Sequence, residues 1–213
     1  MLAVLLVLLS AVLLGANAAD IYAAADGVTS GGCASQGARC TWARAISLVA
    51  SGDTLWVTSD FGVMTIAYSV PAITLTIRSY VSGTYAILEP SATQIVSIDA
   101  AADLTLIDIH LRSATASAIG LRQASAALAL VDCKLTGNTG GKGGAIYVSA
   151  GALTVTDSIF DSNVATERGM DSEGEKGCVP LDNANRALAR VPHASRFPRS
   201  QVAQSTRRLP VRR

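Results

Sequence analysis

The sequence predicts an all-β solenoid, in which the short strands of one turn pair in parallel with the strands of the next turn. One pattern occurs twice, at 128–138 and 153–163, with matching apolar, acidic and amide positions 25 residues apart. Earlier copies begin at Leu104 and, more faintly, at Leu75. The segment 66–163 has strand and turn signals but no helical period. Self-similarity at a fixed period of this size indicates a stack of supersecondary units.

Residues 1–18 are typical of a secretory leader. The apolar run from Leu2 to Leu14 is too short to cross about 30 Å of hydrocarbon, and Ala16-Asn17-Ala18 follows it as a small-x-small cleavage pattern. We expect cleavage near Ala18 or Ala19, with an uncleaved anchor or a buried helix as alternatives. The mature protein is then secreted or displayed on a cell surface, without a transmembrane helix.

Residues 19–57 are expected to form an N-terminal cap and a first strand. Thr41 suits the N-cap of a short helix over 42–50, and Gly52 suits a left-handed residue that ends this helix. In the strand that follows, Leu55 and Val57 alternate with Trp56. A helix at this position would cover the open end of the stack, as terminal repeats require.

Export of the chain would allow its cysteines to form disulfides, because disulfides persist in oxidising compartments. Cys33 and Cys40 flank a short loop and are the disulfide candidates. Cys133 and Cys178 either pair with each other or remain free. Neither histidine lies at ligand spacing from two cysteines, which argues against a zinc site.

Residues 58–166 are expected to hold about four rungs of the solenoid. Two apolar positions of each copy point to one side of its strand, and the residues between them point to the other side. A further apolar column is expected after the first strand of each copy, and a second short apolar segment follows later. The inward pairs are Leu75/Ile77, Leu104/Leu106, Leu128/Leu130 and Leu153/Val155; the outward residues are Thr76, Thr105, Ala129 and Thr154; the further column is Leu111, Leu135 and Phe160; and the later segments begin at Ile95, Ala118 and Ala145.

Residues 167–213 are interpreted as a basic, disordered tail. They carry 10 Lys and Arg against 5 Asp and Glu, whereas residues 1–166 carry 7 against 11. The tail has no apolar periodicity, so it cannot bury enough surface to offset its ordering entropy. An arm that binds acidic partners is an alternative, but nucleic acid is not an expected partner of an exported protein. A truncated repeat array joined to an unrelated end is another alternative.

The repeats resemble those of polymorphic outer membrane proteins. Gly143-Gly144-Ala145-Ile146, followed by Phe160 and Asn163, matches the GGAI and FxxN motifs of that family. The segment 33–57 also resembles the entry of pectin-lyase-like proteins, with a cysteine loop, a short helix and a Gly-Asp-Thr strand. Both resemblances imply a right-handed parallel β-helix over about residues 20–165. They leave the activity open, because this fold hosts lyases, adhesins and receptors.

Three aspartates and two asparagines recur at fixed repeat positions. Asp108, Asp132 and Asp157 should stack about 4.8 Å apart, where like charges repel. Either bound calcium offsets this repulsion, or each carboxylate faces water at a corner and bonds to its own turn. Asn138 and Asn163 are expected to form a hydrogen-bonded amide ladder inside the coil.

Catalytic signatures are weak. The candidate bases Arg112, Arg122 and Lys134 do not follow a lyase pattern, and His110 lacks the flanking glycine found in β-helix glycosidases. The outward threonines could bind a repetitive surface such as ice or a glycan, although Ala129 interrupts them. The sequence therefore predicts an adhesive or structural module without catalytic or cofactor residues, whose partners are cell-surface glycans or proteins. The alternatives are a degenerate carbohydrate-active enzyme and an array without independent activity.

Overall fold

The computed structural model describes residues 18–58, 64–141 and 143–166. Within these ranges the chain is all-β apart from one short α-helix and one 3-10 turn. The sheets are built from parallel pairs. The predicted leader up to residue 17 and the predicted tail from residue 167 lie outside the described residues. None of the described residues belongs to a helix long and apolar enough to cross a bilayer.

Sheet A runs the full length of the described stack and contains the repeat copies seen in the sequence. Leu128 pairs with Leu104 on one side and with Leu153 on the other, and Leu104 pairs with Leu75, as predicted. Its strands, in spatial order, are β1 (Asp20–Val28), β2 (Thr54–Val57), β5 (Thr74–Ser79), β8 (Asp103–Ile107), β11 (Ala127–Val131) and β15 (Ala152–Thr156).

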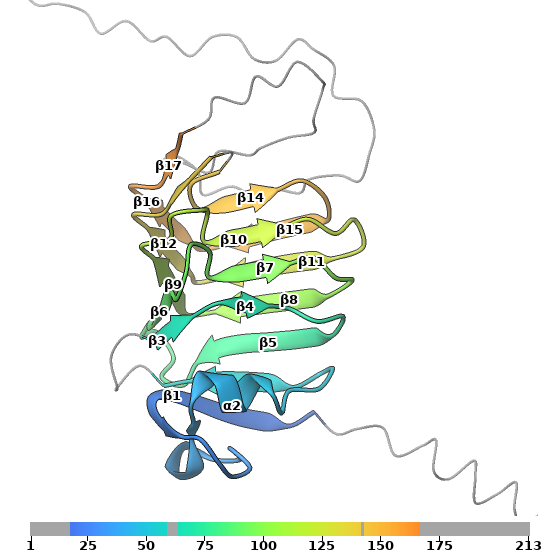
Figure 1. Ribbon diagram of the computed structural model, residues 1–213, viewed down its shortest axis with the longest axis vertical. Helices are drawn as coiled ribbons and strands as arrows, with labels where there is room; N and C mark the ends of the chain where they lie inside the picture. The colour runs from blue at the N-terminus through green and yellow to red at the C-terminus, as the bar shows by residue number, and fades with distance from the viewer. Residues whose placement is uncertain (1–17, 59–63, 142, 167–213) are drawn as a thin grey trace, which may run out of the picture.

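Sheets B, C and D complete the coil, and each turn passes from A to B to C (Figure 1). Sheet B contains β3 (Met64–Ile66), β6 (Ala86–Pro90), β9 (Ile109–Arg112), β12 (Lys134–Thr136) and β16 (Ile159–Asp161). Sheet C contains β4 (Tyr68–Ser69), β7 (Val96–Ile98), β10 (Ile119–Leu121) and β14 (Ile146–Val148). Sheet D pairs β13 (Thr139–Gly140) with β17 (Val164–Ala165). Because sheet C has four strands, the described residues form four complete turns of a right-handed parallel β-helix, as predicted.

The core is a stack of apolar columns that the register aligns, one or more on each sheet. Burying each of these side chains contributes roughly 1.5–3 kcal/mol. The sheet B column confirms the predicted alignment of Leu111, Leu135 and Phe160. The columns are Leu55, Ile77, Leu106, Leu130 and Val155 on sheet A, Leu88, Leu111, Leu135 and Phe160 on sheet B, and Val96, Ile119 and Ile146 on sheet C.

The helix α2 (Trp42–Ile46) covers the first turn. Thr41 is its N-cap, as predicted, and its hydroxyl accepts a hydrogen bond from the Arg44 backbone nitrogen at 3.4 Å. Trp42 packs edge-on against Tyr68 of β4, the edge strand of sheet C, with ring centroids 5.6 Å apart. This contact places the helix against the end of the stack.

The predicted length of this helix was wrong. The helix does not continue to residue 50, because Ser47 donates its side-chain hydroxyl to the Arg44 carbonyl oxygen at 2.7 Å and forms a C-cap. Gly52 is left-handed as expected, with φ 97°, but it lies in the turn that enters β2 and not at the helix end.

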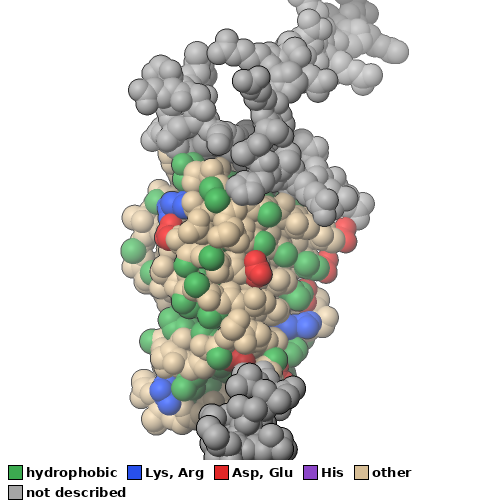
Figure 2. All heavy atoms as spheres, turned by 90° about the vertical axis from the view of Figure 1, so that its right-hand side faces the viewer, with side chains coloured by type: hydrophobic (Ala, Val, Ile, Leu, Met, Phe, Trp, Pro, Cys, Tyr) green, Lys and Arg blue, Asp and Glu red, His purple; other side chains and the backbone are tan. Residues whose placement is uncertain are grey.

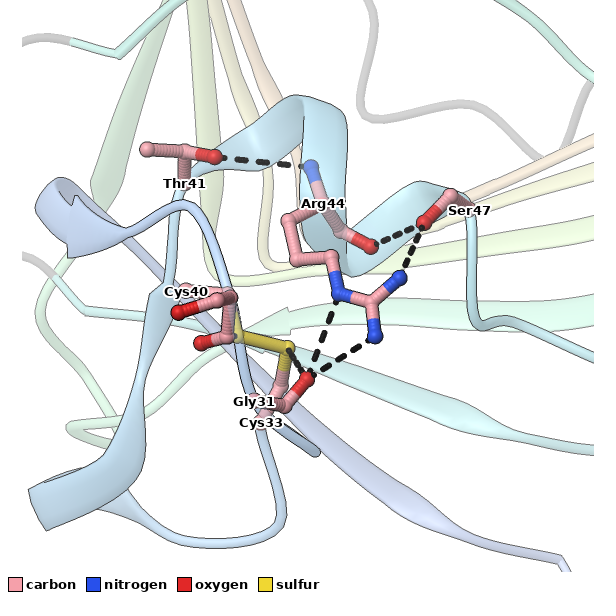
Figure 3. The surroundings of a disulfide bond; sticks show 7 residues. Gly31, Cys33, Cys40, Thr41, Arg44 and Ser47 are labelled. Atoms are coloured by element: carbon pink, nitrogen blue, oxygen red, sulfur yellow. Dashed lines mark hydrogen bonds between the residues drawn. A yellow bond between two sulfur atoms is a disulfide. The ribbon is translucent and has the colours of Figure 1, made fainter.

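The predicted disulfide is present between Cys33 and Cys40, whose Cα atoms are 5.3 Å apart. The loop that it closes contains the 3-10 turn η1 (Gln36–Ala38). Figure 3 shows Arg44 pointing from α2 towards the segment just before Cys33, where its Nε and Nη2 donate to the Gly31 carbonyl oxygen at 3.2 and 3.1 Å. The disulfide therefore closes the loop on itself, and the Arg44 hydrogen bonds fix the segment before Cys33 to the helix.

The third cysteine of the described residues, Cys133, is a free and fully buried thiol. Burial raises the pKa of this thiol to about 12, so it is protonated at neutral pH. The alternative partner Cys178 lies outside the described residues.

Candidate functional site

The two halves of the repeat motif meet between adjacent turns. A Cβ atom at Gly144 would lie 2.5 Å from the Val164 nitrogen, so only glycine allows the backbone after Asn163 to approach. The carbonyl oxygen of Ala145 accepts the backbone N–H groups of Ala118 and Ile119, at 2.9 and 3.1 Å. The motif residues Gly143, Gly144, Ala145, Ile146, Phe160 and Asn163 therefore serve turn-to-turn packing.

The predicted amide ladder is present inside the coil. Asn138 Nδ2 donates to Asn163 Oδ1 at 2.9 Å and to the Leu111 carbonyl oxygen at 3.1 Å. Asn163 Nδ2 donates in turn to the Leu135 carbonyl oxygen at 2.8 Å. Because Asn138 is fully buried, these bonds satisfy groups that water cannot reach, and the ladder is structural.

The three recurring aspartates occupy the same corner, between a strand of sheet A and the following strand of sheet B. Asp108, Asp132 and Asp157 have φ angles of 55°, 49° and 48°, a left-handed conformation that aspartate tolerates better than most residues. The backbone N–H of Asp108 donates to the Val131 carbonyl oxygen, and that of Asp132 to the Thr156 carbonyl oxygen. Asp108 is buried while the other two are exposed, so the carboxylates do not form one uniform surface column.

Calcium at these corners remains a prediction. Among residues 18–58, 64–141 and 143–166, no group of three or more His, Cys, Asp or Glu side chains is placed to hold a metal ion. The left-handed backbone conformation at each corner already accounts for aspartate at these positions.

The outer face of sheet A is flat and carries small hydroxyl side chains in register. The predicted outward threonines align, and Thr54 of β2 extends them by one strand. We call the aligned residues Thr54, Thr76, Thr105, Ala129 and Thr154 the threonine file. Neighbouring members lie about 4.8 Å apart, the spacing of paired strands.

Three aromatic rings and an arginine gather at the N-terminal end of this face. We call Tyr22, Trp56, Arg78 and Tyr80 the aromatic patch. The rings of Tyr22 and Trp56 are nearly parallel with centroids 6.2 Å apart, and Tyr80 meets both rings edge-on at 5.8 and 6.1 Å. The first three residues stand side by side because the register pairs β1 with β2 and β2 with β5.

The polar groups of the aromatic patch are arranged around Trp56. Its indole Nε1 donates to Asp20 Oδ1 at 2.8 Å, and the guanidinium carbon of Arg78 lies 4.6 Å from its ring centroid. None of the three ion pairs found among the described residues includes Arg78, and its Nε, which is buried, has no hydrogen-bond partner there. A cation held by an aromatic face retains donors for an added oxygen acceptor.

The face shown in Figure 2 carries few charges. Figure 2, which views the molecule from the right-hand side of Figure 1, shows acidic and basic side chains scattered among hydrophobic and small polar ones. The aromatic patch is distinguished by its three rings and the arginine beside them. Tyr80 is 36% exposed, and the other three members are half-buried.

A second polar group lies on the outer face of sheet B. His110 Nε2 and Thr136 Oγ1 are 2.7 Å apart, and Arg112 Nε donates to Glu89 Oε1 at 2.7 Å. Lys134 is the register partner of His110. Burial, followed by the charges of Lys134 and Arg112, lowers the pKa of His110, so that the imidazole is neutral at neutral pH.

Two of the candidate bases therefore lie together, and the third does not. Arg112 and Lys134 surround His110 on sheet B, whereas Arg122 follows sheet C strand β10 and pairs with Asp99 at 3.1 Å. The sequence did not predict the aromatic patch. The outward direction of Trp56 could be read from the alternation with Leu55 and Val57, but its neighbours depend on the register of the first two turns.

These observations define the class of protein: a right-handed parallel β-helix with a helical cap and an aromatic patch on an otherwise flat outer face. Comparisons with family models, curated proteins and solved structures found no match to this chain.

Proposed function

We propose that the protein is a secreted or cell-surface binding module that acts by contact through the outer face of sheet A. The leader pattern and the Cys33–Cys40 disulfide support export to an oxidising compartment. The GGAI and FxxN residues, which resemble those of polymorphic outer membrane proteins, support display at a surface. Repetition of small hydroxyl side chains along one flank suits weak contacts that add up.

The aromatic patch is the observation that carries this proposal. Aromatic residues make up 5% of the sequence, yet three of them meet on one solvent-facing surface. Trp, Tyr and Arg are also the residues that most often dominate binding energy at interfaces. Their gathering beside the Arg78 guanidinium, which belongs to no ion pair within residues 18–58, 64–141 and 143–166, supports a ligand that offers both apolar surface and oxygen acceptors.

The ligand class that fits best is an extended glycan. Small molecules are bound in concave pockets that bury most of their surface, whereas this face is one side of a six-stranded parallel sheet. A sugar polymer presents apolar C–H faces to aromatic rings and hydroxyl groups to Arg78, Asp20 and the threonine file. A protein partner is the alternative that the experiment below separates.

Calorimetric titration of the full mature chain with neutral and acidic polysaccharides tests the proposal. We expect saturable binding that Tyr80→Ala weakens about tenfold, because an exposed aromatic anchor is lost. Tyr147→Ala is the matched control, since Tyr147 is a half-buried tyrosine 5.9 Å from Arg122 on sheet C. Equal loss in both variants, or binding only to proteins, would reject the glycan surface.

A second candidate function is that of a carbohydrate-active enzyme, and His110 favours it. A neutral imidazole beside Lys134 and Arg112 can accept a proton from a substrate whose negative charge the two cations offset. Incubation of the mature chain with acidic polysaccharides, with and without calcium, tests this reaction. Chain cleavage that His110→Gln abolishes would support the enzyme, and binding without turnover would leave the contact module.

A further inference from the structure

The carboxylate of Asp53 is buried at the N-terminal end of the stack and is held by two backbone nitrogens. Its Oδ1 accepts from the Ala19 nitrogen at 2.8 Å, and its Oδ2 accepts from the Ala50 nitrogen at 2.7 Å. Asp53 is 4% exposed, and none of the ion pairs among the described residues includes it. A buried carboxylate without a cation is costly unless another group supplies positive charge.

The residue that donates to this carboxylate directly follows the leader pattern. The apolar run ends at Leu14, and the small-x-small residues Ala16-Asn17-Ala18 immediately precede Ala19. The carbonyl oxygen of Ala19 also accepts the Thr54 backbone N–H at 2.9 Å, so both backbone groups of Ala19 are fixed. The residue that follows the small-x-small pattern, Ala19, is therefore hydrogen-bonded to Asp53.

We propose that the leader is removed between Ala18 and Ala19, and that the new α-ammonium group of Ala19 forms an ion pair with Asp53. Processing then converts a neutral amide donor into a charged one at the same position. The inference goes beyond the binding function, because it assigns a processing site and a role for the new terminus in stability.

The step is a hydrolysis by an endopeptidase of the signal-peptidase class. Water adds across the Ala18–Ala19 peptide bond, its oxygen bonding to the Ala18 carbonyl carbon as the carbon–nitrogen bond breaks. The Ala18 side leaves as a carboxylate, and the Ala19 nitrogen carries the released protons as an ammonium group at neutral pH. No oxidant, reductant or further co-reactant is needed.

The folded contacts of Ala19 fit the terminus released at this bond and not one released at a neighbouring bond. Cleavage after Ala19 would remove both the nitrogen that reaches Asp53 and the carbonyl oxygen that binds Thr54. Cleavage earlier than Ala18 would leave an amide at Ala19 and move the charge away. Only hydrolysis before Ala19 places the ammonium group 2.8 Å from the carboxylate oxygen.

The ion pair would secure the edge of sheet A, because β1 is its first strand and bonds only to β2 within that sheet. Ala50 and Asp53 flank the turn between α2 and β2, so the same carboxylate also holds the cap in place. Charge-assisted hydrogen bonds are roughly twice as strong as neutral ones. The processed chain should therefore be more stable than any chain extended at its N terminus.

The first test is N-terminal sequencing of the protein exported by cells that express the full chain. Mature protein that begins at Ala19 supports the proposal. A mature protein that begins at Asp20 or elsewhere, or one that retains the leader, would overturn it.

The second test compares urea unfolding of the chain that begins at Ala19 with the same chain carrying one added glycine before Ala19. The added glycine keeps the amide donor but moves the charge, and we expect the unfolding equilibrium constant to increase about tenfold. In the Asp53→Asn background this difference should vanish. Equal stability of the two Asp53 chains, or a difference that persists with Asp53→Asn, would overturn the ion pair. If Asp53→Asn does not fold, the two chains that retain Asp53 still show whether the added glycine lowers the free energy of unfolding.

Discussion

The corner aspartates set the direction in which the chain leaves sheet A. Each of them takes a left-handed conformation, which costs most residues roughly 1–2 kcal/mol but which aspartate, asparagine and glycine adopt readily. The main role of each aspartate is therefore to allow the left-handed backbone conformation of the corner. A calcium ligand or a surface charge would add to that role.

Replacement of Asp132 tests the corner directly. Asp132→Ala should lower the free energy of unfolding by about 1–2 kcal/mol, whereas Asp132→Gly should be close to neutral. Urea denaturation measures both. Asp161→Ala serves as the control, because Asp161 is an exposed residue of β16 outside the left-handed set. An alanine variant as stable as the glycine variant would contradict the backbone role.

His110 gives the stability a pH dependence with a defined sign. Burial, with Lys134 and Arg112, lowers the pKa of His110, and the opposing charge of Glu89 does not reverse this. The unfolded chain then binds more protons than the folded one just below pH 6.5, so the folded state loses stability as the pH falls through that region.

Unfolding midpoints measured from pH 7.5 to about pH 5 for the natural protein and for His110→Gln check this expectation. The natural protein should lose more stability on acidification than the variant does. Parallel curves would show that His110 titrates alike in both states.

At the scale of elements, the disulfide loop and α2 act as one cap. The bridge closes a short loop, with a sequence separation of 7 between its cysteines, immediately before the helix. In the chain-entropy model such a loop contributes about 2–3 kcal/mol. The Cys33→Ser, Cys40→Ser double variant should therefore unfold at lower urea, by about that free energy. The reduced natural protein is the second reference. An unchanged midpoint would contradict this contribution and would mean that noncovalent contacts, such as the hydrogen bond from Tyr22 N to the Cys33 carbonyl oxygen, hold the loop without the bridge.

The repeats could be predicted from the sequence because their interior is periodic. The intervals between the sheet A partners Thr105, Ala129 and Thr154 are 24 and 25 residues, and the leucines around them revealed the register. The end of α2 could not be predicted from the spacing of apolar residues, which continues beyond residue 46. The helix ends earlier because the Ser47 hydroxyl donates a hydrogen bond to the backbone.

The aromatic patch could not be predicted from the sequence, because the first turns differ in length. The partners Thr54, Thr76 and Thr105 are separated by 22 and then 29 residues, so no fixed period connects the first turns with the later ones. The sequence therefore indicated that Trp56 points outwards but not that Tyr22 and Arg78 flank it. A site assembled across irregular intervals needs the register, which only the fold supplies.

At the scale of the whole molecule, each turn contacts chiefly the turns next to it, so stability accumulates along the stack. The cap, the ladder of Asn138 and Asn163 and the apolar columns serve that stacking. The aromatic patch does not belong to this interior: among the described residues its side chains are half-buried or exposed on the outer face of sheet A. The proposed function therefore rests on the aromatic patch of the outer face and not on the packed interior.

The fluorescence of Trp56 tests the binding surface most directly. The sequence has two tryptophans, and Trp42→Phe leaves Trp56 as the only one while keeping a ring against Tyr68. In that variant, a polysaccharide that binds by calorimetry should change the Trp56 emission with the same dissociation constant and reduce its quenching by acrylamide. Binding that leaves both the emission and the quenching of Trp56 unchanged would contradict the assignment of the outer face of sheet A.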